Sequence, residues 1–95
     1  MGAFGGTNMG DAIKDVLSER AKTHGSFADV ARVAQSIKGA MYCVERRGTV
    51  SYETRESLDM IATKIARIIC GNEFEPDHWL DIEGYARLAR ENIDG

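Results

Sequence analysis

The chain has 95 residues and a mass of 10.5 kDa, enough polypeptide for one hydrophobic core and not for two. Its composition, 43% hydrophobic and 28% charged, is that of a folded protein and excludes a disordered one. The net charge of -3 argues against a nucleic-acid partner bound through its phosphates. Since no stretch approaches the roughly 20 apolar residues of a bilayer span and no secretory leader opens the chain, we expect no membrane partner and a cytoplasmic location.

Glycine is concentrated at the start of the chain. Glycine backbones lose the most conformational entropy on ordering, and chain ends are often loose. We therefore expect residues 1–10 to form a flexible glycine-rich arm and residues 11–95 to form a single helical domain. The alternative is that Phe4 and Met9 hold the arm against a neighbouring subunit.

Apolar residues recur at intervals of three and four along the rest of the chain, a spacing typical of α-helices. Gly25, Gly48 and Gly71 each follow such a segment, at the position where helices commonly end in a left-handed residue. The first helix is expected over residues 11–23. The second is expected over residues 26–44, with the serine that opens this range as its N-cap.

Two further helices are expected in the second half of the chain. The third opens at Thr49 or Ser51 and carries an apolar stripe to Ile69. The fourth starts at Pro76, which is tolerated in a first helical turn, and continues to about Asn92. Its apolar seam consists of Trp79, Ile82, Ala86, Ala89 and Ile93. The sequence therefore predicts an all-α fold, a compact antiparallel bundle of about four short helices.

A bundle of this size buries only a modest core, and apolar side chains remain outside the predicted seams. Leu80 and Leu88 lie off the seam of the fourth helix, and Met60 falls opposite the stripe of the third. We therefore expect a homo-oligomer to complete the bundle. The alternative is that these residues are singly exposed, as is common on protein surfaces.

Polar residues form one ridge on each of the last two helices. The third-helix ridge consists of Asp59, Thr63, Lys64 and Arg67. The fourth-helix ridge consists of Asp77, His78, Asp81 and Tyr85. If the two helices pack antiparallel, the ridges meet in a groove that fits a phosphate or Mg²⁺. Hard cations take oxygen ligands, so Asp59, Asp77 and Asp81 are the candidate metal ligands. The alternative is that these charges form solvated ion pairs worth about 0.2 to 1 kcal/mol.

The turn around His24, Gly25 and Ser26 is a second candidate site, because one helix stops there and the next begins at once. Exposed amides at the new amino terminus can hold an anion beside His24. The alternative, at least as well supported, is a capped turn in which Ser26 satisfies the second helix and His24 bonds the preceding carbonyls.

Three blocks of the chain also carry motifs. They are residues 23–27 with Thr-His-Gly-Ser-Phe, residues 59–68, and residues 77–86 with the specific pattern His-Trp-x-Asp-Ile-x-Gly-Tyr. Together the blocks resemble a phage-encoded family of small proteins of unknown function. That family is distantly similar to the MazG-like all-α nucleotide pyrophosphohydrolases and to a related phage nucleotide-modification domain. The positions that match their Lys-x-x-Arg and Asp-x-x-x-Asp-x-x-x-Tyr patterns are Lys64, Arg67, Asp77, Asp81 and Tyr85.

The resemblance implies a helical cleft that recognises a nucleotide or another phosphorylated ligand. Lys64 and Arg67 would neutralise the phosphate, and Trp79 or Tyr85 would stack on the base. The candidate ligand-binding residues are His24, Lys64, Arg67, His78, Trp79 and Tyr85.

Hydrolysis is the less favoured activity. MazG-like enzymes hold Mg²⁺ with a Glu-x-x-Glu pair on one helix and a Glu-x-x-Asp pair on the next. Here Glu53 and Glu56 have the first spacing, but they precede the apolar stripe and lie at the start of the third helix. Acidic side chains at this position are explained by their favourable interaction with the positive end of the helix dipole. Binding therefore ranks above a Mg²⁺-dependent pyrophosphohydrolase activity.

The predicted function is that of a phage or prophage accessory protein, in an infected or lysogenic bacterium, that binds a nucleotide or another phosphorylated ligand. The alternative is a non-enzymatic anti-defence protein, either a nucleotide-signal sponge or an acidic inhibitor that occludes a host defence complex such as CRISPR-Cas. A third class, DNA binding by a helix-turn-helix around residues 24–26, is weakened by the net negative charge.

Overall fold

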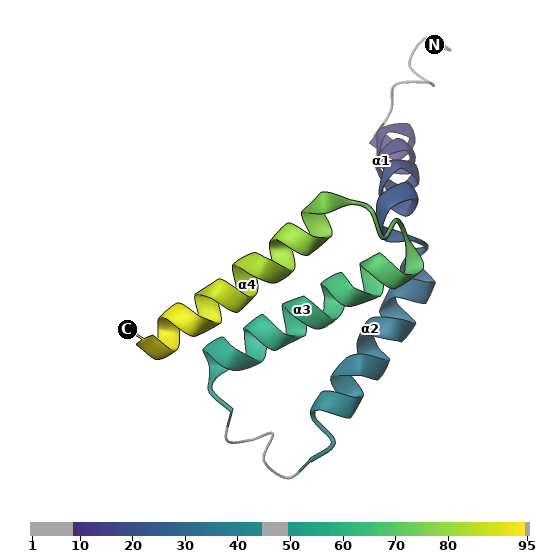
Figure 1. Cartoon of the computed structure of the whole chain (residues 1–95). Coiled ribbons are helices and arrows are strands. Elements are labelled where there is room, and N and C mark those ends of the chain that lie inside the picture. Colours follow the sequence, from purple (N-terminus) through teal and green to yellow (C-terminus); the bar gives the residue numbers. More distant parts are fainter. Residues whose placement is uncertain (1–8, 45–49, 95) are drawn as a thin grey trace, which may run out of the picture.

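The computed structural model describes residues 9–44 and 50–94, and these residues form four helices with no strand (Figure 1). The helices are α1 (Met9–His24), α2 (Phe27–Met41), α3 (Tyr52–Cys70) and α4 (Pro76–Asp94). The predicted all-α bundle is therefore confirmed. None of these helices has a stretch long and apolar enough to cross a membrane. Residues 1–8 of the predicted arm, and Gly48, lie outside the described part of the chain.

Serine side chains begin two of the helices. The Ser26 hydroxyl accepts a hydrogen bond from the Asp29 amide, and the Ser51 hydroxyl accepts one from the Thr54 amide, each over 3.2 Å. Such bonds satisfy amides that have no partner within the helix. Ser26 is thus the N-cap that the sequence predicts, and Ser51, one of the two residues at which the third helix was expected to open, caps α3. The second helix is shorter than expected, because the chain leaves helical geometry directly after Met41.

Helix α3 is the central element of the bundle, with α2 packed on one side and α4 on the other (Figure 1). Small side chains make the contact between α2 and α3. Ala34 and Ala66 are buried there together with Val30, and Val33 and Cys70 pack against them. Short side chains let two helix backbones approach closely, so the few buried residues of this contact are mostly small ones.

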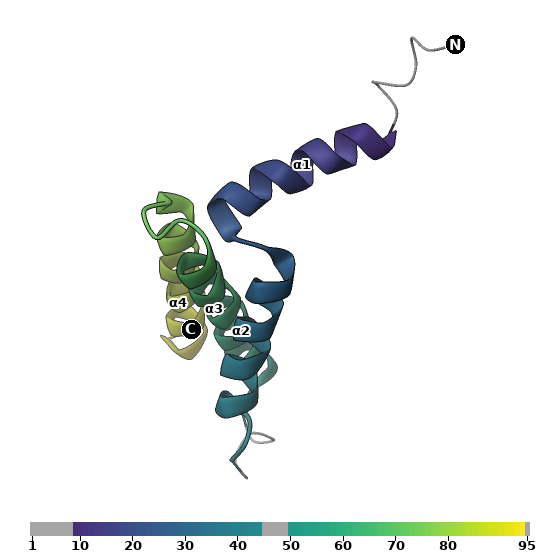
Figure 2. The same ribbon diagram turned by 90° about the vertical axis from the view of Figure 1, so that its right-hand side faces the viewer.

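Helix α1 leaves this layer and touches it only near its carboxyl end (Figure 2). Most of its length lies away from the other helices, and Ile13, Val16 and Leu17 are exposed. The position of α1 therefore depends on the turn that connects it to α2.

The buried side of α4 differs from the predicted seam. Trp79 is 54% exposed and Ile93 is also exposed, whereas His78 is 2% exposed. Ile82 and Ala89 are partly buried, as expected. The prediction placed Trp79 in the seam because of its spacing of three and four residues from the other apolar side chains. The structure instead buries the histidine, which finds a hydrogen-bond partner on another helix.

Candidate ligand-binding cleft

Two turns meet where α1 and α3 end, and each contains a glycine. Gly25 has a φ of 85°, the left-handed conformation that the sequence predicts. A β-carbon on Gly25 would overlap the backbone carbonyl of Cys70, and a β-carbon on Gly71 would overlap the carbonyl oxygen of Thr23. Gly71 has a φ of -119°, so close approach, and not the predicted left-handed backbone, requires glycine there. The two glycines let the ends of α1 and α3 touch.

The carbonyl oxygen of Thr23 joins three helix ends at this junction. It accepts hydrogen bonds from the Asn72 amide over 3.0 Å and from His78 Nε2 over 2.9 Å. Because a carbonyl oxygen only accepts, Nε2 of His78 carries a proton. The bond satisfies a ring nitrogen of a side chain that is almost completely buried. The end of α1 is thereby fixed to the start of α4.

His24 lies beside this buried histidine, with 5.0 Å between the two ring centroids and an angle of 54° between the planes. Its pKa is lowered from 6.5, first by burial and then by the charges of its neighbours Arg67, His78, Lys64 and Arg20. At neutral pH the His24 ring is therefore uncharged. An anion bound nearby would oppose those positive charges and raise the pKa.

An ion pair connects α3 to α4. Lys64 Nζ lies 2.8 Å from Asp81 Oδ2, and only 9% of Lys64 is exposed. The hydrogen bond from Lys64 lowers the pKa of Asp81 from its usual 3.8. A buried ammonium group without a partner is strongly destabilising, so Asp81 is what permits a lysine at this position. The Lys64 nitrogen consequently has a partner within the chain.

A cleft of about 510 Å³ opens beside the junction, between α1, α2 and α3. Its basic lining residues are Arg20, His24, Lys38 and Arg67. Its apolar lining residues are Leu17, Ala21, Phe27, Val30, Ala31 and Ala34. None of the described residues that line the cleft is an aspartate or a glutamate. The cleft therefore combines positive charge with an apolar wall.

The structure divides the six predicted ligand-binding residues into two groups. His24 and Arg67 line the cleft, and Lys64 and His78 lie close enough to lower the pKa of His24. Trp79 lies elsewhere, with its indole N–H donating to the carbonyl oxygen of Glu73 over 2.9 Å. Tyr85 also lies outside the cleft and lines a hollow on α4.

The three predicted metal ligands do not come together. Asp59 accepts a hydrogen bond from the Tyr42 hydroxyl over 2.7 Å, Asp77 is exposed, and Asp81 pairs with Lys64. Among residues 9–44 and 50–94, no group of three or more histidine, cysteine, aspartate or glutamate side chains could hold a metal ion.

The cleft also contains two basic residues and one aromatic residue that are absent from the sequence-based candidates, namely Arg20, Lys38 and Phe27. Arg20 lies four residues before His24, and this spacing places both side chains on one helix face. Arg20 could therefore have been predicted from the sequence as a neighbour of His24. Lys38 and Phe27 come from α2. Their place beside α1 depends on the backbone at Gly25, which residue spacing does not specify.

No protein family, curated protein or solved structure matches this chain. The interpretation of the cleft therefore rests on its own geometry and charge.

Proposed function

We propose that this chain binds a phosphorylated small molecule of the nucleotide class in the cleft between α1, α2 and α3, and holds it without hydrolysis. One observation carries the proposal: basic side chains from three helices line one cleft that has an apolar wall and no carboxylate among its described lining residues. The cleft volume of about 510 Å³ suits such a ligand, since small-molecule sites commonly measure about 300 to 1,000 Å³.

The anionic part of the ligand would bind the basic side chains. Arg67 and Lys38 are partly buried in the cleft, and Arg20 is at its α1 edge. A guanidinium group can donate two parallel hydrogen bonds to a phosphate, while an ammonium group acts as a point charge. The neutral ring of His24 supplies one further polar contact, and it would gain a proton as the anion raises its pKa.

The apolar part of the ligand would lie against Phe27 and Leu17. Phe27 is 86% exposed although it lines the cleft, and Leu17 is exposed as well. An exposed phenyl ring is a platform on which a base can stack, worth about 1 to 3 kcal/mol per base in nucleic-acid complexes. Phe27 thus takes the stacking role that the sequence suggested for Trp79 or Tyr85.

The chemistry of the lining residues favours retention over turnover. Phosphoester hydrolysis with Mg²⁺ needs carboxylates that hold the metal and activate water. The described lining residues offer no carboxylate for that purpose. A nucleotide-signal sponge must also hold its ligand without converting it. Of the two anti-defence alternatives, we therefore favour the sponge over the inhibitor that occludes a host complex. The phage origin stays a prediction.

Calorimetric titration tests the proposal, with nucleoside mono- and triphosphates and cyclic dinucleotides added in the presence and absence of Mg²⁺. At least one of these ligands is expected to bind, and chromatography after denaturation is expected to recover it intact. Conversion of the ligand to products would support the hydrolytic alternative. Absence of binding across all of these ligands would contradict the proposal.

Variants locate the binding to the cleft. Arg67→Gln and Lys38→Gln each remove a charged donor, and the loss of one charge-assisted hydrogen bond is expected to weaken binding about 10- to 100-fold. Arg32→Gln is the matched control, because Arg32 lies on the same helix as Lys38 and pairs with Asp29 outside the cleft. Equal weakening by all three substitutions would indicate nonspecific attraction to positive charge.

A further inference from the structure

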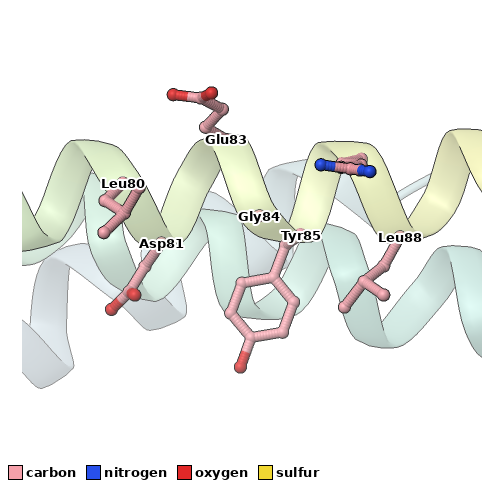
Figure 3. Close-up of a pocket in the computed structure, with 7 residues that line it drawn as sticks. Leu80, Asp81, Glu83, Gly84, Tyr85 and Leu88 are labelled. Atoms are coloured by element: carbon pink, nitrogen blue, oxygen red, sulfur yellow. The ribbon is translucent and has the colours of Figure 1, made fainter.

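The outer face of α4 carries apolar side chains around a glycine. Leu80 and Leu88 are 61% and 60% exposed, and they lie on either side of Gly84 along α4 (Figure 3). A hollow of about 430 Å³ lies here, and its lining includes Leu80, Gly84, Tyr85 and Leu88. A β-carbon on Gly84 would meet no atom within 4 Å. Glycine in a helix interior costs about 1 kcal/mol relative to alanine, and packing within the chain does not account for that cost.

The pattern of residues around Gly84 is complementary to itself. Leu80 lies four residues before this glycine and Leu88 four residues after it, so all three form one ridge along α4. Glu83 and Arg87 are one turn apart along one edge of the same face. Arg87 Nε pairs with Glu91 Oε1 of the same chain over 2.7 Å, and the other donors of its guanidinium group can bond to a second carboxylate. If a second α4 crosses antiparallel at Gly84, Leu80 of each copy opposes Leu88 of the other. Glu83 of each copy then lies beside Arg87 of the other.

We infer that α4 is a homodimer interface, in which two copies of this chain cross antiparallel at Gly84. A two-fold axis requires that each residue pair occur twice, and both the leucine pair and the Glu–Arg pair fulfil this requirement. The missing side chain at Gly84 lets the two helix backbones approach at the crossing point. This charge complementarity favours a second copy over an unrelated partner.

A contact of one helix with another is small, so the dimer should exchange with the monomer. Specific interfaces with high affinity bury more surface than two crossed helices provide. Sedimentation equilibrium of the wild-type chain is therefore expected to show a mass that rises from one copy toward two as concentration increases. A mass of one copy at every concentration that can be reached would overturn the inference.

Substitution at the crossing point tests the geometry. Gly84→Leu inserts a side chain where the backbones meet, and it is expected to weaken dimerisation about tenfold or more while helical content is retained. Gly39→Leu is the matched control, because Gly39 also lies inside a helix with no atom within 4 Å of a β-carbon. A dimer equally strong in both variants would overturn the inference.

Exchange of charges tests the register. Glu83→Arg places arginine beside Arg87 of the other copy and is expected to weaken the dimer. The double variant Glu83→Arg/Arg87→Glu restores opposite charges across the two-fold axis and is expected to recover it. Both side chains are exposed, and the Arg87–Glu91 ion pair that Arg87→Glu removes lies on the surface. Exposed ion pairs contribute little to stability, so neither change should prevent folding, which circular dichroism verifies. A double variant that dimerises no better than the single one would exclude the antiparallel register.

Discussion

Substitution of Gly25 by alanine tests the account of the junction between α1 and α3. Alanine at a φ of 85° costs about 1 to 2 kcal/mol, because its β-carbon crowds the following carbonyl. The same β-carbon would overlap the backbone carbonyl of Cys70, which cannot rotate away as a side chain could. Overpacking of this kind costs about 1 to 3 kcal/mol. The expected loss in the free energy of unfolding is therefore about 2 to 5 kcal/mol.

Urea and thermal unfolding measure this loss, with Gly39→Ala as the control. In a chain of this size each kcal/mol lowers Tm by about 4 to 8 °C, so Gly25→Ala should unfold at least about 8 °C below the wild type. Gly39→Ala should instead gain about 0.5 to 1 kcal/mol, because a β-carbon there meets no other atom and alanine is the better helix former. A Gly25→Ala variant within about 0.5 kcal/mol of the wild type would refute the argued role of this glycine.

Two further predictions concern single side chains. Burial and the charge of Arg67 lower the pKa of His24 below 6.5, so the unfolded chain binds more protons than the folded chain in the pH window just below that value. The free energy of unfolding should therefore fall as pH drops through this window, and His24→Gln should flatten the fall in a urea series. Tyr42→Phe removes the hydrogen bond to Asp59 and should lower the free energy of unfolding by about 1 kcal/mol. Because neither Tyr42 nor Asp59 lines the cleft, ligand affinity should not change, and calorimetry checks this.

Local signals in the sequence predict the helices well. Ser26 and Ser51 cap α2 and α3, and Pro76 opens α4, because each acts through the backbone within one turn. The left-handed turn at Gly25 is predicted for the same reason. Such features depend only on residues that are close in the sequence, so they can be predicted from one amino-acid sequence.

Features that depend on distant partners could not be predicted in this way. His78 is buried because its ring bonds to Thr23, which lies 55 residues earlier in the chain. Lys64 is buried because Asp81 on another helix compensates its charge. Residue spacing predicted that both side chains lie on polar ridges. It could not show which polar groups on different helices would form hydrogen bonds or ion pairs with each other.

The composition of the cleft depends on the angle between α1 and α2. Arg67 and His24 could be named from the sequence, but Lys38 and Phe27 join them only because α1 turns at Gly25 and meets α3 at its end. A change of one turn conformation would move Arg20 and His24 away from α2. The arrangement of the cleft is therefore a tertiary property that helical periodicity does not contain.

Titration of the two histidine rings by NMR, with and without a nucleotide, tests the central claim most directly. If the phosphate binds between Arg67, Lys38 and His24, the pKa of His24 should rise on addition of nucleotide, because a negative charge then offsets the basic neighbours that lower it. Resonances of Phe27 should shift at the same nucleotide concentrations. A His24 pKa that stays constant while a nucleotide binds, or shifts confined to α4, would contradict the assignment of this cleft as the binding site.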